Sequence, residues 1–474
     1  MFYKLPENID CNVFLIDEQG NSIDYSTFFK VQLEFQKNIF SRALVLILCE
    51  NSSGAVMGLV SFLMNGQIPL LMESNSDPIF IHNLIKTYKI EYIFARKDAH
   101  NSLSNLLAVA EIGEFVLLKT GEHSDIPPNP DLALLLSTSG STGSPKLVRL
   151  SYQNIISNGR AIVEYLKITA ENRAITTLPL SYSFGFSIIN SHILAGASII
   201  LTSKSIVERG FWEQFQKYNP TSLSGVPFTF ELLRRIKFFT KRPQDSLCVI
   251  TQAGGKMTNE LILEVDRFSK ENDISFYVMY GQTEATARIS YLSPRYTKLK
   301  IGSIGKAIPG GQLKIDFLEN DATSSTYASG ELIYSGPNVM MGYAENRLDL
   351  AKNDELKGQL STGDIATVDN DGFYFIVGRK KRFLKIHGKR LNLDEIEAIL
   401  STESNPIVCS GIDDHLEIYT LRESEVSDVS KLKNLVTSKF NVNPLGVRIH
   451  VMEKFPRLEN GKINYKELEN LIHE

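Results

Sequence analysis

Cysteines, long apolar runs and an excess of charge of one sign are scarce in this 474-residue chain. Its cysteines are Cys11, Cys49, Cys248 and Cys409, which are far apart and form no C-x-x-C pair. This spacing argues against a disulfide framework and against a zinc site. No apolar run reaches the roughly 18 residues that a membrane-spanning helix needs. The net charge of −4 and the pI of about 6.1 give no sign of a nucleic-acid-binding protein.

The rest of the composition is typical of a globular protein with more than one domain. Hydrophobic residues make up 43% and charged residues 22% of the chain, which are ordinary values. A length of 474 residues exceeds what a single core usually organises. The N-terminal segment Met1–Glu7 contains an acid and a proline and lacks the apolar core of a signal peptide. We therefore expect a cytoplasmic enzyme in a reducing compartment, with no nucleic-acid partner and no membrane span.

Short apolar runs alternate with amphipathic segments in the first two-thirds of the chain. The runs Ala43–Cys49 and Ile68–Met72 predict buried strands, and Ser53–Met64 between them predicts a helix. This alternation indicates an α/β fold with mostly parallel sheets flanked by helices. Further runs of the same kind are Ala174–Leu178, Ser198–Leu201 and Cys248–Thr251.

The pattern changes in the last third. From about Ile301 the segments become short and rich in turns, which predicts a β-rich subdomain with strands at Gly330–Tyr334 and Gly372–Val377. A polar, basic run at Gly378–Arg382 then marks a boundary. We expect a large N-terminal domain over residues 1–380 and a small α+β domain over residues 381–474.

The most informative segment is the loop that follows the apolar run Leu132–Leu136. It reads S-T-S-G-S-T-G-S-P-K and ends at Lys146. Glycines let backbone N–H groups approach an anion, hydroxyls add donors, and the lysine adds a positive charge, so the loop suits a polyphosphate. It does not have the Walker spacing, because Gly140 and Gly143 are too close together and Pro145 precedes the lysine. A Ser/Gly-rich linker is the alternative interpretation of the same segment.

Four later segments favour the phosphate-binding interpretation. They are Tyr280–Glu284 (YGQTE), Ser361–Asp364 (STGD), Gly378–Arg379 and Asn460–Ile463 (NGKI). Each alone is compatible with an ordinary turn. In this order, with T-S-G-S-T-G-S-P-K and Leu178–Gly185, they resemble the adenylate-forming superfamily of acyl-CoA synthetases, peptide-synthetase adenylation domains and luciferases. The resemblance covers nearly the whole chain and implies a large N-terminal domain with a mobile C-terminal lid.

The resemblance implies a two-step reaction. A carboxylic acid attacks ATP to give an acyl-AMP and pyrophosphate, and a thiol of CoA or of carrier-protein phosphopantetheine then displaces AMP. ATP and Mg²⁺ would be the cofactors, and an acyl carrier protein is a further partner to consider. Because two anions must react, fixed positive charge and N–H donors are the main catalytic resource.

The same resemblance assigns roles to individual residues. Lys462 and Thr283 would act on the α-phosphate, and Glu284, a hard carboxylate suited to Mg²⁺, would bind the metal together with Thr138. The nucleotide-binding set would be Thr138, Ser139, Gly140, Ser141, Thr142, Gly143, Lys146, Gly254, Gly255, Tyr280, Gly281, Asp364 and Arg379. The pocket for the acid would be lined by Tyr182, Phe184, Gly185 and Phe228, and the hinge of the lid would be Lys381.

Departures from the family pattern bear on the substrate. Relatives that activate amino acids carry an Asp directly after a Phe in the pocket motif, whereas Gly185 follows Phe184 here. A buried ammonium without a carboxylate is costly, so a standard α-amino acid is disfavoured. The aromatic residues suit an apolar or aromatic acid, but they are equally typical of an ordinary core. The hinge position is usually Asp, although some relatives have Lys, as Lys381 is here.

Two alternative functions remain open at this stage. One is transfer of the acyl group to an amine. The other is a catalytically silent nucleotide-binding relative, which the joint presence of Thr283, Glu284, Asp364 and Lys462 argues against. The basic cluster from Arg379 to Arg390 is either a solvated edge of the lid or a landing site for CoA phosphates or an acidic carrier protein.

Overall fold

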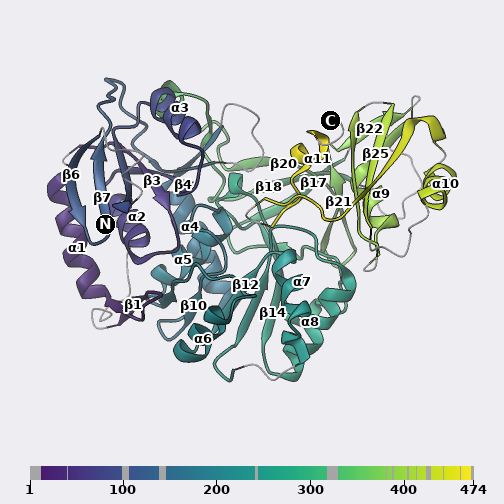
Figure 1. Cartoon of the computed structure of the whole chain (residues 1–474), viewed down its shortest axis with the longest axis horizontal. Helices are drawn as coiled ribbons and strands as arrows, with labels where there is room; N and C mark the ends of the chain where they lie inside the picture. Colours follow the sequence, from purple (N-terminus) through teal and green to yellow (C-terminus); the bar gives the residue numbers. More distant parts are fainter. Residues whose placement is uncertain are drawn as a thin grey trace.

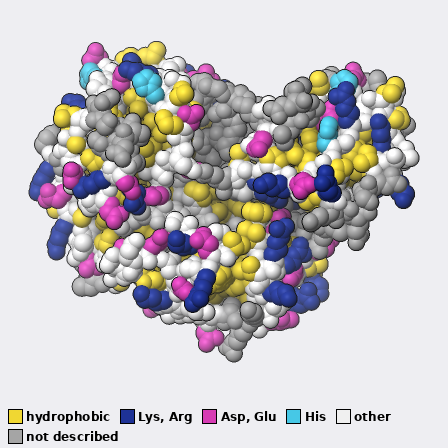
Figure 2. Space-filling view, in the orientation of Figure 1, with side chains coloured by type: hydrophobic (Ala, Val, Ile, Leu, Met, Phe, Trp, Pro, Cys, Tyr) yellow, Lys and Arg dark blue, Asp and Glu magenta, His cyan; other side chains and the backbone are white. Residues whose placement is uncertain are grey.

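The computed structural model describes residues 12–39, 41–98, 106–137, 146–240, 244–317, 329–380, 382–386, 389–402, 405–412, 414–422, 429–440, 442–458 and 461–470. Two large mixed sheets and their helices form the main body, and the last part of the chain lies beside it (Figure 1). Lys and Arg side chains lie among Asp and Glu side chains over much of the visible face, as the small net charge suggests (Figure 2).

The first sheet carries at its centre the strand that leads into the Ser/Gly-rich loop. Its order is β19-β9-β8-β4-β3-β5-β7-β6, and the central strands β8, β4, β3 and β5 are parallel. The strands are β3 (Leu44–Cys49), β4 (Ile68–Glu73), β5 (Tyr92–Arg96), β6 (Leu107–Ile112), β7 (Phe115–Lys119), β8 (Leu132–Ser137), β9 (Leu147–Ser151) and β19 (Gly342–Ala344). The associated helices are α1 (Tyr25–Asn38), α2 (Ser53–Met64) and α3 (Pro78–Tyr88).

The second sheet contains the strand that ends at the YGQTE motif. Its order is β16-β15-β14-β13-β12-β10-β11-β1-β2, and the strands from β14 to β1 are parallel. The strands are β1 (Val13–Ile16), β2 (Ser22–Asp24), β10 (Arg173–Ile175), β11 (Ser198–Ile200), β12 (Ser222–Gly225), β13 (Val249–Gln252), β14 (Ser275–Tyr280), β15 (Ser290–Leu292) and β16 (Lys306–Ala307). The helices are α4 (Tyr152–Leu166), α5 (Ser183–Leu194), α6 (Arg209–Tyr218), α7 (Pro227–Arg235) and α8 (Asn259–Glu271).

The two sheets share a hydrophobic core. Buried residues of α1, α2 and α5 pack with residues of β1 and β11 on one side and of β3 and β8 on the other. Short 3₁₀ turns complete this region, at η2 (Phe238–Thr240), η3 (Thr283–Ala285), η4 (Pro294–Tyr296) and η5 (Arg347–Ala351). This core fixes the carboxyl ends of β8, β13 and β14, where ligands bind in open α/β sheets.

The predicted β-rich subdomain is an antiparallel sheet of β17 (Gln312–Phe317), β18 (Gly330–Ser335), β20 (Gln359–Val368) and β21 (Tyr374–Arg379). The C-terminal part has its own hydrophobic core. It consists of β22 (Phe383–Ile386), β23 (Lys389–Asn392), α9 (Leu393–Leu400), β24 (Ile407–Ile412), β25 (His415–Leu421), α10 (Val429–Phe440), η6 (Pro444–Gly446), β26 (Val447–Met452) and α11 (Tyr465–Asn470).

The predicted elements are largely confirmed. Helix α2 has the predicted bounds, and it begins there because the Ser52 side chain accepts a hydrogen bond from the Ala55 N–H. The S-T-G-D motif, whose composition is compatible with an ordinary turn, lies inside β20. Within the described residues, no helix is long and apolar enough to cross a membrane.

Candidate active site

The candidate site is assembled where several strands end. Gly254 and Gly255 follow β13, Tyr280 is the last residue of β14, and Lys146 precedes β9. Because parallel strands point their carboxyl ends to one edge, β13 and β14 place their following turns side by side. The predicted phosphate-binding residues Thr138, Ser139, Gly140, Ser141, Thr142 and Gly143 lie outside the described residues.

The turn after β14 is tightly specified. A Cβ atom at Gly281 would lie 1.6 Å from the Ala287 carbonyl oxygen, so only glycine fits this close approach. The Asn338 side-chain amide donates to the carbonyl oxygens of Ala285, at 2.8 Å, and of Arg288, at 2.9 Å. These contacts fix the backbone on both sides of the turn that carries Thr283 and Glu284.

Thr283 and Glu284 are each held by a hydroxyl group from another part of the chain. Thr283 Oγ1 donates to Ser183 Oγ, 3.2 Å away at the start of α5. The Tyr343 hydroxyl donates to Glu284 Oε1 at 2.7 Å. The carboxylate of Glu284 is therefore oriented by a tyrosine 59 residues further along the chain.

Lys146 lies next to the same tyrosine. Its ammonium is 2.7 Å from Glu345 Oε1 and 5.9 Å from the centre of the Tyr343 ring. Tyr343 thus lies between the end of the Ser/Gly-rich loop and the YGQTE turn. Tyr343 and Glu345 were not predicted from the sequence, because the Gly-Tyr-Ala-Glu segment that contains them belongs to none of the motifs identified there.

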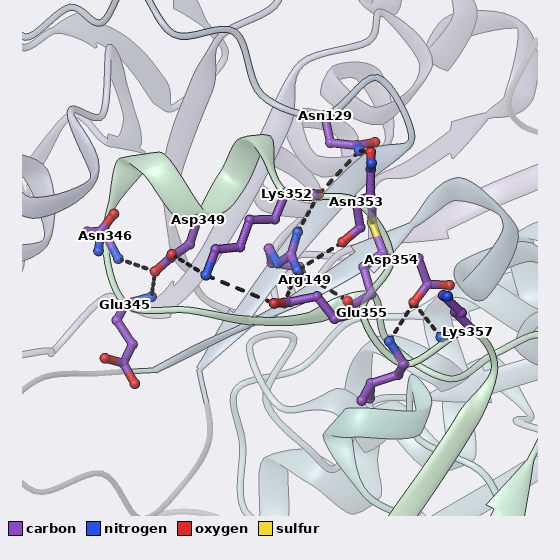
Figure 3. Close-up of polar contacts among 12 residues, drawn as sticks. Asn129, Arg149, Glu345, Asn346, Asp349, Lys352, Asn353, Asp354, Glu355 and Lys357 are labelled. Carbon is purple, nitrogen blue, oxygen red and sulfur yellow. Dashed lines mark hydrogen bonds and ion pairs between the residues drawn. The ribbon is translucent and has the colours of Figure 1, made fainter.

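A buried arginine anchors the segment that carries Tyr343. Strand β19 pairs with β9, and Arg149 of β9 is fully buried. Its side chain lies among the residues that come after β19 in the sequence (Figure 3). Its guanidinium donates to the Lys352 carbonyl oxygen at 2.7 Å and to Glu355 Oε2 at 2.5 Å. Removing water from these groups strengthens their interaction, so Arg149 fixes the loop over residues 345–355 to the first sheet.

The STGD motif and the basic run meet across β20 and β21. Asp364 is opposite Arg379 in the register, and Arg379 Nε lies 3.2 Å from Asp364 Oδ1. The Tyr280 hydroxyl donates to Asp364 Oδ2. Burial raises the pKa of the Asp364 carboxyl, and the Arg379 charge opposes that rise. The arrangement therefore brings together three predicted nucleotide-binding residues from separate motifs.

Lys462 reaches the same place from the C-terminal part. Its ammonium lies 5.5 Å from the centre of the Tyr182 ring. Burial and then the Arg379 charge lower the pKa of Lys462, while Glu284 and Asp364 act in the opposite direction. The lysine is therefore within electrostatic range of both carboxylates.

The segment before Lys462 is docked on the first turn of α7. The Arg457 guanidinium lies 4.6 Å from the centre of the Phe228 ring and 3.5 Å from Glu231 Oε2. A Cβ atom at Gly461, whose φ is +78°, would lie 3.1 Å from a Val226 methyl group. This glycine conformation and these contacts hold Lys462 against the main body.

The predicted pocket residues surround the start of α5. The Tyr182 and Phe184 rings are 6.3 Å apart, and Gly254, with φ of +87°, would place a Cβ atom 2.7 Å from the Tyr182 hydroxyl. Gly185 has a packing reason, because its Cβ atom would lie 2.1 Å from the Pro179 carbonyl oxygen. Phe184 is buried, and the Arg288 guanidinium lies 3.9 Å from the centre of its ring. Arg288 was not predicted from the sequence.

Much of the basic cluster is engaged in ion pairs. Lys380 pairs with Glu331 at 2.7 Å, and Arg382 pairs with Asp394 and with Glu397. The predicted hinge, Lys381, lies between them and outside the described residues.

The donor set around Glu284 suits a magnesium ion held jointly with phosphates. Within the described part of the chain, no group of three or more His, Cys, Asp or Glu residues could hold a metal ion. Mg²⁺ usually takes one or two carboxylates and completes its shell with water and substrate phosphates. Glu284 is a single hard carboxylate that fits this mode of binding, and its partner Tyr343 lies next to Lys146 at the end of the Ser/Gly-rich loop.

Comparisons with known proteins agree with this geometry. The family model described as AMP-binding enzyme matches residues 32–344. The 2-succinylbenzoate–CoA ligase of Bacillus subtilis is 26% identical over 347 residues, which are 71% of this chain and 68% of that protein. The structure of o-succinylbenzoate CoA synthetase (MenE) from B. subtilis with its acyl-adenylate has a TM-score of 0.74 at 21% identity, over 97% of this chain and 95% of that one. ATP-bound MatB from Rhodopseudomonas palustris has a TM-score of 0.77 at 18% identity, over 99% and 97%.

These matches confirm the predicted fold class and the prediction of an AMP-forming acid–thiol ligase. The family model covers more than half of the sequence. The chain therefore belongs to the AMP-binding enzyme family.

Proposed function

We propose that this chain activates a carboxylic acid as an acyl-AMP at the site around Lys462 and passes the acyl group to the thiol of CoA. The observation that carries this proposal is the position of Lys462, which lies over Tyr182 and within electrostatic range of Glu284 and Asp364. A cation at this point can stabilise the charge that develops between two reacting anions. A protein that only binds nucleotides does not need a cation at this position.

ATP would be held by residues from several separate motifs. Thr138, Ser139, Gly140, Ser141, Thr142 and Gly143 with Lys146 would bind the β- and γ-phosphates. Asp364 would accept hydrogen bonds from the ribose hydroxyls, with Arg379 beside it, and Tyr280, Gly281, Gly254 and Gly255 would contact the base and the α-phosphate side. Glu284 and Thr138 would hold Mg²⁺, which neutralises phosphate charge when it is bound.

The chemistry of the first step follows from this placement. A carboxylate oxygen of the acid attacks the α-phosphorus, and the bond to the pyrophosphate oxygen breaks. Lys462 stabilises the charge between the carboxylate and the α-phosphate, while Thr283 hydrogen-bonds the α-phosphate. Lys146 steadies the departing pyrophosphate. In the second step a thiolate attacks the acyl carbon, and AMP leaves.

The second step would use a rotation of the C-terminal part. We place the domains at residues 1–380 and 381–474, with Lys381 as the hinge. Lys380 pairs with Glu331 of the β-rich sheet, whereas Arg382 pairs with Glu397 of α9 in the C-terminal part. Because Lys380 is paired with the N-terminal part and Arg382 with the C-terminal part, the backbone of Lys381 between them would take up the rotation.

The acceptor is the finer part of the proposal. The 2-succinylbenzoate–CoA ligases among the relatives use CoA by name, which supports CoA for this chain. Since Arg379, Lys380 and Arg382 pair with carboxylates, they are less available to contact the acidic surface of a carrier protein. A carrier protein and an amine are therefore the alternatives that the test must include.

Hydroxamate trapping with a panel of carboxylic acids tests the activity. ATP-dependent hydroxamate from at least one acid is expected, together with AMP and pyrophosphate in equal amounts. Product analysis with CoA, a phosphopantetheinylated carrier protein and simple amines then identifies the acceptor. Absence of hydroxamate from every acid would refute the proposal, provided that ATP binding is intact.

A further inference from the structure

Arg288 is a buried cation that the reaction itself does not use. It follows the YGQTE turn, and its side chain is 2% exposed. Its backbone is fixed, because the Asn158 and Asn338 side chains donate to its carbonyl oxygen at 3.0 and 2.9 Å. Within the described residues no carboxylate forms an ion pair with it, in contrast to the equally buried Arg149, which pairs with Glu355. Burial of a guanidinium without a carboxylate partner is costly, and an anionic ligand would offset that cost.

The guanidinium of Arg288 stacks on an aromatic ring and keeps one donor unpaired. Its face lies on the Phe184 ring at 3.9 Å. A guanidinium stacked in this way keeps its N–H donors in the plane of the group, where they match the two oxygens of a carboxylate. Its Nε is buried and has no hydrogen-bond partner. Burial lowers the pKa of Arg288, and the Tyr165 hydroxyl opposes that decrease.

A small cavity adjoins Arg288. It has a volume of about 30 Å³ and lies between α4, α5 and the strands β12 and β13. Its apolar wall includes Ile162 and Ile188, and its polar lining includes Ser224 and His192. Burial lowers the pKa of His192 to about 4, and its Nδ1 lies 2.8 Å from the Ile188 carbonyl oxygen, so the imidazole is neutral. Among the described residues that line this cavity, Arg288 therefore supplies the only charge. The space suits a carboxylate and is too small for a long alkyl chain.

Two aromatic side chains, Phe184 and Tyr182, lie between Arg288 and Lys462. Lys462 lies 5.5 Å from the Tyr182 ring. The charge of Arg288 also acts on Tyr182, opposing the rise that burial causes in the pKa of its hydroxyl. The Arg288 guanidinium lies 3.9 Å from the centre of the Phe184 ring, and that ring lies 6.3 Å from the Tyr182 ring, so the two aromatic side chains connect the two cations.

We propose that Arg288 binds a second anionic group of the substrate, so that the enzyme selects a dicarboxylic acid. This inference rests on the proposed function, because it names the class of acid that the same site takes. Lys462 would meet the carboxylate that reacts, and Arg288 would fix the distal one. A site built to bind a charged group rejects the analogue that lacks it, because its buried polar atoms are then left unpaired.

A matched pair of acids tests this proposal. One is 2-succinylbenzoate, and the other is 4-oxo-4-phenylbutanoate, which is the same molecule without the ring carboxylate. ATP–pyrophosphate exchange gives kcat/KM for both acids with the wild type and with Arg288→Met, Arg288→Lys and Arg295→Met. Arg295 is a fitting control, because it also stacks on a ring, that of Tyr296 at 4.6 Å, but is exposed.

The wild type is expected to prefer the dicarboxylate at least tenfold. In Arg288→Met the ratio should fall close to one, mainly through KM, whereas Arg295→Met should keep the wild-type ratio. Arg288→Lys should lose at least threefold of the preference, because it keeps the charge but not the planar fork; this variant decides if Arg288→Met does not fold. A wild-type ratio near or below one, or a ratio unchanged in the Arg288 variants, would overturn the inference. If no acid supports ATP–pyrophosphate exchange in the wild type, the proposed function itself is refuted.

Discussion

Replacement of Lys462 by alanine is the most direct test of the site. The ammonium lies over Tyr182 at 5.5 Å, and the nearby charges of Arg379, Glu284 and Asp364 act on it. The variant removes one positive charge from a partly buried position while leaving Asp364, Arg379 and Lys146 in place. ATP binding should therefore persist, and the chemical step should slow.

The size of the effect follows from the electrostatics. At an effective dielectric constant of about 20, two unit charges about 4 Å apart interact by roughly 4 kcal/mol. Loss of a single preorganised donor from a site of developing negative charge typically costs roughly 10²- to 10³-fold in rate. We expect ATP–pyrophosphate exchange by Lys462→Ala to fall within or above this range, with the Kd for ATP changed by less than about threefold.

The control is Lys454→Ala, which removes an exposed lysine from the same part of the chain. It should retain exchange within about twofold of the wild type. Exchange within about tenfold of the wild type in Lys462→Ala would show that the lysine does not stabilise the reacting groups. A loss of ATP binding in parallel with exchange would instead indicate a binding role.

Four further predictions follow from the geometry. Arg379→Gln removes a neighbouring cation that, together with burial, lowers the pKa of Lys462 from its usual 10.5. Because the protonated lysine is the active form, the decrease in exchange rate at alkaline pH should move to higher pH in this variant. A pH–rate profile whose alkaline side does not move would contradict this coupling. Lys381→Pro, which fixes φ at the proposed hinge, should spare exchange and slow thioester formation at least tenfold in single-turnover assays, whereas equal slowing of both steps would exclude this hinge. Arg149→Met should lower the free energy of unfolding by about 2–4 kcal/mol and Tm by roughly 5–10 °C, against little change in Arg209→Met, whose side chain is 93% exposed. Gly254→Ala should raise KM for the acid, because the new Cβ would meet the Tyr182 hydroxyl, while Gly66→Ala, with a similar φ of +83° and open space around it, should change stability only.

Local pattern was sufficient for most secondary structure. The apolar run Leu44–Cys49 and the segment Ser53–Met64 differ in period and composition, and each adopts the element that its pattern predicts. The prediction was less accurate where a motif contributes to tertiary packing. The S-T-G-D motif reads as a turn, yet the pairing of β20 with β18 and β21 draws it into a strand. Similarly, Gly185 reads as part of a pocket, and its close contact with Pro179 becomes evident only when α5 is packed.

The sequence predicted which residues could carry the chemistry of the candidate site, but it did not predict the residues that hold them in place. Lys146, Glu284, Asp364 and Lys462 each belong to a motif, so their residue types and order were sufficient to propose roles for them. Tyr343 and Arg288 belong to no such motif. Their importance comes from contacts with Glu284 and with the Phe184 ring, across separations in sequence of 59 and 104 residues.

The sequence by itself determined the family and the α/β architecture, and it was sufficient to propose which residues bind ATP, because these inferences depend on short-range composition and on motif order. The tertiary structure decided that Lys462 lies over Tyr182, that Tyr343 orients the Glu284 carboxylate, and that the buried Arg288 stacks on Phe184. These properties depend on distances between segments that are remote along the chain. Such distances are fixed by the packing of two sheets and their helices, and no local pattern encodes them.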